Sequence, residues 1–124
     1  MKYAKKALLQ SIKTDDVGLM ALTKAKLRDR FMIAGHVSRA INVGREVIGT
    51  YQVLREEHQV AHARFSLGRI YHQSDNYHLG LIYLLDCLEI YKKFEDYYNQ
   101  AKVQLSIGAI YEHFGDDKNA IVAY

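Results

Sequence analysis

Proline and tryptophan are absent from this chain of 124 residues, and cysteine occurs once, at Cys87. Without proline, nothing interrupts long helices, and loop-rich or proline-rich folds are disfavoured. A single cysteine cannot close a disulfide within the chain, which excludes a small disulfide-stabilised module. The longest apolar run, residues 79–85, is far shorter than the ~20 residues of a membrane-spanning helix. No signal-peptide pattern opens the chain, so we expect a cytoplasmic protein without membrane segments.

The composition is that of a folded domain, with 49% hydrophobic and 25% charged residues. The charges are unevenly distributed. Residues 1–60 carry 11 Lys/Arg against 6 Asp/Glu, and residues 61–124 carry 6 against 8. The basic residues recur at helical spacing among apolar ones, which is typical of solvated helix faces rather than of a nucleic-acid surface.

The sequence repeats itself with a period of 40 residues. Apolar residues match when residues 21–60, 61–100 and 101–124 are aligned. The matched sets include Ala21, Ala61 and Ala101; Leu27, Leu67 and Ile107; Phe31, Tyr71 and Tyr111; and Ile41, Leu81 and Ile121. A period of this length indicates stacked copies of one supersecondary unit.

Within each unit the apolar residues follow helical spacing, interrupted by turn-forming residues. We predict helices at about 21–34, 38–55, 58–73, 77–94 and 98–113, with another beginning near residue 117. Ser74-Asp75-Asn76 and Gly115-Asp116 form the breaks. Asp15-Asp16 and Asp116-Asp117 are placed at further turns between helices. Each unit is therefore expected to be a helical hairpin.

Small residues recur where the two helices of a hairpin should meet. Gly68 faces Gly80 in one unit, and Gly108 faces Ala120 in the next. Glycine inside a helix costs about 1 kcal/mol relative to alanine, so we expect close helix contact at these positions. Arg28 stands where a small residue is expected, which predicts looser packing in the first hairpin.

These residues carry a family resemblance. Leu67-Gly68-Arg69-Ile70-Tyr71 and Ile107-Gly108-Ala109-Ile110-Tyr111, each followed by the turn described above, resemble the tetratricopeptide repeat (TPR). The usual repeat has 34 residues, and the longer form is similar to that of bacterial signalling proteins and kinesin light chains. The resemblance implies an all-α fold of stacked antiparallel helical hairpins in a right-handed superhelix, as one domain over residues 1–124.

The repeat register also divides the chain. Residues 1–20 align with the second helix of an incomplete repeat, before repeats 21–60 and 61–100 and a truncated repeat at 101–124. Both ends cut through a repeat, so we expect a fragment of a longer protein with uncovered apolar ends. Such ends predict self-association as a homodimer. The residues expected at these ends are Ala4, Leu8, Leu9 and Ile12, and Ile110, Phe114, Ile121 and Tyr124.

No residue pattern points to catalysis or to a cofactor. His58 and His62 share a helix face, but Gln59 stands where a zinc protease needs its glutamate, and no third ligand is near in sequence. Cys87 follows the buried stripe and is expected to be a core residue. We predict a chain that is not an enzyme and holds no metal or cofactor.

The resemblance implies binding of a protein or peptide along the first helices of the hairpins. The expected groove residues are Ala25, Asp29, Met32, His62, Phe65, Arg69, His72, Lys102, Leu105, Ala109 and Glu112. Arg69 is the predicted anion-binding residue and Phe65 the predicted apolar anchor. Two alternatives are a self-association module and an RNA-binding helical repeat, the latter weakened by Asp29 and Glu112. The favoured role is the sensory or scaffolding part of a larger bacterial regulatory protein.

Overall fold

The computed structural model describes residues 2–115, with side chains from residue 16 onward. These residues form five helices and no strand. The helices are α1 (Lys2–Ile33), α2 (Val37–Val53), α3 (Glu57–Gln73), α4 (Tyr77–Lys93) and α5 (Tyr97–His113). The predicted all-α class is confirmed, and the last four helices agree with their predicted bounds to within one or two residues. None of the helices in this part of the chain is long and apolar enough to cross a membrane.

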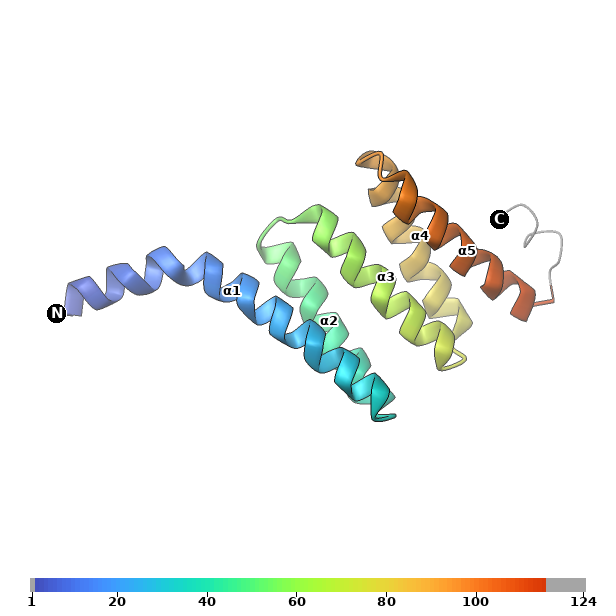
Figure 1. The fold of residues 1–124 in the computed structure, drawn as a ribbon, viewed down its shortest axis with the longest axis horizontal. Coiled ribbons are helices and arrows are strands. Elements are labelled where there is room, and N and C mark those ends of the chain that lie inside the picture. Colours follow the sequence, from blue (N-terminus) through green and yellow to red (C-terminus); the bar gives the residue numbers. More distant parts are fainter. Residues whose placement is uncertain (1, 116–124) are drawn as a thin grey trace.

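Successive helices pack side by side in a zigzag (Figure 1). Helices α1 and α2 form one hairpin, and α3 and α4 form the next. Helix α2 then packs on α3, and α4 packs on α5, so each second helix lies between two first helices. The first helices α1, α3 and α5 therefore line one side of the stack, and α2 and α4 line the other.

Each of the four turns between the described helices places one residue in the left-handed backbone region. Gly35, Arg55, Asp75 and Glu95 occupy this position, with φ of 81°, 57°, 64° and 53°. Gly115, just after α5, has the same conformation with φ of 73°. Backbone N–H groups just after each helix then donate to carbonyls of its last turn. The predicted breaks at residues 74–76 and at Gly115 are confirmed.

One predicted turn is wrong. Helix α1 runs without interruption from Lys2 to Ile33, so no turn forms at Asp15-Asp16. A turn gives up helical hydrogen bonds and puts one residue at positive φ, a cost of about 1–2 kcal/mol for a non-glycine residue. At the other turns of the stack, packing between the two helices that the turn joins offsets this cost. The turn predicted at Asp116-Asp117 lies outside the described residues.

The predicted contact between Gly68 and Gly80 is confirmed. A Cβ on Gly68 would lie 3.1 Å from the Leu84 side chain and 3.2 Å from the Gly80 carbonyl oxygen. Gly108 is buried as well, but its predicted partner Ala120 lies outside the described residues. Looser packing of the first hairpin stays a prediction; the Arg28 side chain on which it rests is buried beside Gly44.

The core consists of two apolar clusters, one on each side of α3. The first joins α1, α2 and α3, and the second joins α3, α4 and α5. Cys87 lies in the second cluster with no exposed surface, and burial raises the pKa of its thiol to about 12. It is the core residue that the sequence predicts, and not an activated thiolate.

Candidate functional site: a groove along the first helices

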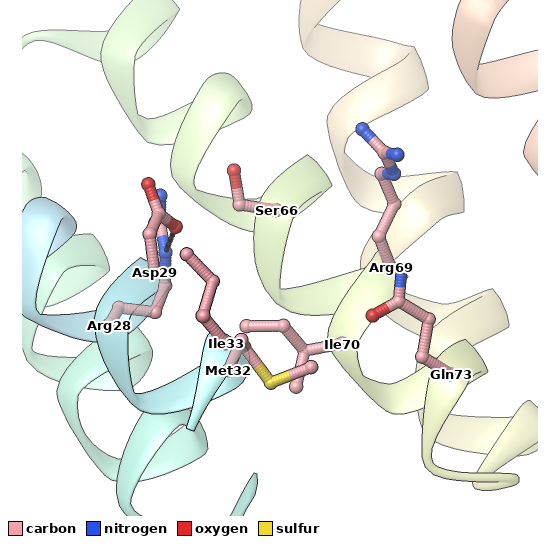
Figure 2. A pocket seen from close by; sticks show the side chains of 8 residues that line it. All are labelled: Arg28, Asp29, Met32, Ile33, Ser66, Arg69, Ile70 and Gln73. Atoms are coloured by element: carbon pink, nitrogen blue, oxygen red, sulfur yellow. Dashed lines mark hydrogen bonds and ion pairs between the residues drawn. The ribbon is translucent and has the colours of Figure 1, made fainter. Parts of the chain in front are cut away.

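Two adjoining hollows lie between α1 and α3, on the side of the stack formed by the first helices. Their volumes are about 230 and 170 Å³, and they share Arg28 and Ser66. Figure 2 shows the larger hollow, with Met32 of α1 lying against Ile70 of α3 and Ile33 at the edge of the hollow. Apolar side chains thus form the floor of a groove that runs along the two helices.

Five of the eleven predicted groove residues line these two hollows. Asp29, Met32 and Arg69 belong to the larger hollow. Ala25 and His62 belong to the smaller one. The first two repeats therefore contribute to one continuous surface.

Phe65 does not serve as the predicted anchor, because only 8% of its surface is exposed and it belongs to the core cluster of α3, α4 and α5. Two cations lie over its ring instead. The Arg69 guanidinium carbon is 5.7 Å from the ring centroid, and Lys102 Nζ is 5.8 Å from it. Lys102 Nζ also lies 5.3 Å from the ring centroid of Tyr98. The Phe65 ring therefore stabilises the positions of the two cations by cation–π attraction.

Arg69 and Lys102 form no ion pair with any of the described residues. Both side chains are exposed. Asp29 differs, because its carboxylate accepts a hydrogen bond from Arg28 Nε at 3.1 Å. The α3–α5 part of the surface is thus cationic and unneutralised, whereas the charges on α1 are partly compensated.

The histidines at the N-terminal end of α3 form hydrogen bonds with α4 and with the turn after it. His58 Nε2 lies 2.8 Å from Asp96 Oδ2, and His62 Nδ1 shares a hydrogen bond with the Tyr91 hydroxyl. The Asn99 side chain and His58 lower the pKa of Asp96 to about 2. Burial, with a smaller effect of His58, lowers the pKa of His62. His62 is thus neutral at neutral pH and adds no charge to the groove.

The C-terminal end of the groove holds a second aromatic group. The rings of His72 and His113 lie 5.1 Å apart, and Tyr77 stacks on His113 at 4.8 Å. Burial and His113 lower the pKa of His72. The predicted groove residue His72 therefore bridges α3 and α5 at this end.

The three remaining predicted residues lie on α5, outside the two hollows. Leu105 is exposed, Ala109 is half-buried, and Glu112 is exposed. They extend the face of the first helices beyond Lys102 without closing a hollow of their own.

Sequence reasoning missed several residues that line the groove. Helix spacing could have found those on α3, since Ser66, Ile70 and Gln73 are four and three residues apart and share a face. The predicted face of α3 was rotated toward α5, so it omitted the side that meets α1. The omitted lining residues are Leu22, Arg28, Ile33, Val47, Tyr51, Gln59, Ala63, Ser66, Ile70 and Gln73.

The described residues contain no group of three or more His, Cys, Asp or Glu side chains arranged to hold a metal ion. His58 and His62 stack on each other with ring centroids 4.9 Å apart. The groove offers hydrogen-bond donors, an apolar floor and two cations, Arg69 and Lys102, that form no ion pair with a described residue; these are the components of a binding surface.

Comparisons with known proteins define the fold. No family model matches the sequence, and no curated protein matches it. Among solved structures, the TPR domain of Arabidopsis FLU matches with a TM-score of 0.81 at 18% identity, covering 87% of this chain and 91% of that one. BtubC (BKLC) from P. vanneervenii matches with a TM-score of 0.79 at 23% identity, covering 94% of this chain and 50% of that one.

The TPR-like repeats of a putative kinesin light chain from Podosopora anserina match with a TM-score of 0.70 at 19% identity, covering 82% of this chain and 50% of that one. The chain therefore spans about half the length of the second and third of these structures. It has the TPR-like fold that the repeat motifs predicted.

Proposed function

We propose that this chain is a non-catalytic module that binds an extended, acidic peptide segment of a partner protein along α1, α3 and α5. The observation that carries the proposal is the pair of unneutralised cations, Arg69 and Lys102, placed over Phe65. A carboxylate of the ligand pairs with the guanidinium of Arg69 in a bidentate manner. Lys102 adds a second positive charge on the neighbouring helix.

The hollow beside Arg69 supplies the apolar part of the site. Met32, Ile33 and Ile70 form a floor that an apolar side chain of the ligand covers. Because Ile33 is almost fully exposed in the unbound chain, its burial contributes to binding through the hydrophobic effect. The ligand that fits best therefore carries an apolar residue close to an acidic one.

Binding of a peptide array to the full chain tests the proposal. The array holds extended peptides that combine one large apolar residue with acidic, neutral or basic neighbours. We expect the acidic peptides to bind tightest. The double variant Arg69→Ala, Lys102→Ala is expected to lose on the order of tenfold or more of that affinity.

A matched control removes one arginine and one lysine elsewhere. Arg55 lies in the α2–α3 turn and Lys92 near the end of α4, away from the groove. The control variant Arg55→Ala, Lys92→Ala has the same net charge and should keep the affinity. Equal losses in both variants would mean that net charge alone attracts the peptide, and would refute the groove.

Self-association is the alternative function, and the exposed apolar residues of α1 favour it. Two copies that pair through α1 bring Lys26 and Arg30 of both chains together, which opposes the pairing. Sedimentation of the full chain at tens of micromolar distinguishes the alternatives. A stable homodimer that no longer binds peptides would replace the peptide-binding proposal.

The proposal also places the module in the cytoplasm, as the sensory or scaffolding part of a larger bacterial regulatory protein. Fractionation of cells that express the full-length protein tests this placement.

A further inference from the structure

One face of α1 has no other helix of residues 2–115 packed against it. Helix α1 lies at the end of the stack, and its principal partner among the described helices is α2 (Figure 1). Residues Met20, Thr23, Leu27 and Phe31 are three or four residues apart, so they share this face. Met20 is 51% exposed and Leu27 is 41% exposed. Leu19 adds a further exposed apolar side chain at the edge of the face.

The repeat shows how the same face is used elsewhere in the molecule. The residues of α3 that lie 40 positions later are Val60, Ala63, Leu67 and Tyr71. Each of them is at most 5% exposed, because α2 packs against them. The contact is close: a Cβ on Gly44 of α2 would lie 3.2 Å from Leu67 Cδ1.

The corresponding face of α5 is covered in the same way. Val103 and Ile107 are 0% and 4% exposed in the cluster that α4 completes. In both covered cases the partner is a helix with apolar residues three and four apart. A helix of that kind would fit the open face of α1 with the geometry already present twice in the stack.

The open face differs from its two covered equivalents in its charge. Lys26 and Arg30 border the apolar residues and are exposed, and neither forms an ion pair with a described residue. The equivalent positions in α3 hold Ser66 and Ile70. The Arg39 guanidinium, 6.0 Å from the ring centroid of Phe31, adds a third cation at the end of the face. Lys24 is compensated, since it pairs with Glu46 at 3.4 Å.

A shallow hollow of about 370 Å³ lies at the N-terminal part of this face, lined by Asp16, Leu19, Met20, Thr23 and Lys24. We propose that the open face of α1 is a second docking site, distinct from the groove, for an acidic amphipathic helix of a partner protein. The helix packs on Met20, Leu27 and Phe31 as α2 packs on α3, and its acidic residues pair with Lys26 and Arg30. A second copy of this chain fits less well, because α1 would meet the same cations on its partner.

Two synthetic helices with the same apolar face test the proposal. Both copy residues 37–54, which cover the equivalent face of α3. The acidic probe carries Ser38→Glu, Asn42→Glu and Arg45→Glu, and the basic probe carries Ser38→Lys and Asn42→Lys. All of these positions are exposed in the chain. Fluorescence anisotropy of each labelled probe with the full chain gives its affinity.

We expect the acidic probe to bind on the order of tenfold tighter than the basic probe, with a difference that shrinks as salt is added. Charge reversal in the chain, Lys26→Glu with Arg30→Glu, should invert the preference. Leu27→Glu should abolish binding of both probes. The matched control Ile82→Glu, at a similarly exposed apolar residue of α4, should leave binding unchanged. Circular dichroism verifies that each variant remains folded.

Three results would overturn the proposal. Equal binding of the two probes would show that the cations do not select the partner, and absence of binding would show that the face takes no helix. Concentration-dependent dimerisation that Leu27→Glu abolishes would assign the face to a second copy of the chain. Because none of these variants touches Arg69 or Lys102, the groove can be tested separately.

Discussion

The Arg28 side chain occupies space that Gly44 leaves open in the first hairpin. Arg28 Cδ lies 3.6 Å from the position that a Cβ on Gly44 would take. At the same two repeat positions, the second hairpin has the glycine on its first helix, Gly68, and the large side chain on its second, Leu84. The Leu84 side chain lies 3.1 Å from the position that a Cβ on Gly68 would take. Each hairpin therefore combines one large and one absent side chain, which keeps the packed volume similar.

Substitutions that exchange the large side chain and the glycine between positions 28 and 44 test this compensation. Gly44→Leu alone should destabilise the fold by about 1–3 kcal/mol, because the new side chain meets Leu67 and Arg28. Arg28→Gly alone should also destabilise it, through a void and the low helix propensity of glycine. The double variant should recover about 1 kcal/mol or more relative to the sum of the single losses. Urea unfolding of the four proteins measures this coupling, and strict additivity would mean that the two residues do not compensate each other.

Two glycine-to-alanine substitutions should change the stability of the fold in opposite directions. Gly68→Ala places a Cβ 3.2 Å from the Gly80 carbonyl oxygen, where the backbone cannot easily yield. We expect a net loss of about 1–2 kcal/mol despite the better helix propensity of alanine.

Gly49 has no other group within 4 Å of its Cβ position. Gly49→Ala should therefore stabilise the fold by up to about 1 kcal/mol. Thermal unfolding of both variants measures the contrast. If both lower the melting temperature by the same amount, the hairpin contact at Gly68 is not the reason for its glycine.

The fold was predictable because each repeat shows the same pattern of buried apolar and small residues. Leu67 and Ile107 occupy one buried position in successive units, and Gly68 and Gly108 another, so helix register could be determined without tertiary information. The course of the chain around Asp15-Asp16 could not be predicted in this way. A turn there depends on packing between the helices on either side, which local sequence does not report.

Acid should weaken the fold through the half-buried histidines. Burial lowers the pKa of His62 and of His72, so the folded state binds protons less readily than the unfolded state. Stability is therefore complete above the unfolded pKa, about 6.5, and falls as the pH drops from there toward the folded pKa. The double variant His62→Gln, His72→Gln should flatten the dependence of melting temperature on pH between 7.5 and 5.

The exposed His78 provides the matched control. His78→Gln should keep the slope of the wild-type chain over the same pH interval. A slope that both variants lower equally would assign the acid sensitivity to other groups.

The N-caps of α4 and α5 should differ in their response to acid. Asn76 accepts a hydrogen bond from the Leu79 N–H, and Asp96 accepts one from the Asn99 N–H. Asn76→Ala and Asp96→Ala should each cost about 1 kcal/mol near neutral pH. Only the contribution of Asp96 should disappear in acid, because its folded pKa of about 2 lies below the unfolded value.

Urea unfolding between pH 5 and pH 2 measures this difference. The loss caused by Asp96→Ala should shrink as the pH falls from about 4 toward 2, and the loss caused by Asn76→Ala should stay constant. Parallel losses at every pH would show that the Asp96 charge does not stabilise the cap.

The groove was only partly predictable from the sequence. Repeat register placed Asp29, Met32 and Arg69 on one surface, because it determines which side of each first helix is free. The burial of Phe65 was not predictable, since it depends on how closely α5 approaches α3. The same approach brings Lys102 over the ring, and a contact between residues 37 positions apart leaves no local pattern in the sequence.

A backbone amide chemical-shift map of the full chain with an acidic, apolar-containing peptide shows which helices the bound peptide contacts. We expect the largest changes on α1, α3 and α5, around Met32, Arg69 and Lys102, and we expect Arg69→Ala with Lys102→Ala to remove them. Changes concentrated on α2 and α4 would contradict this expectation, because those helices form the other side of the stack.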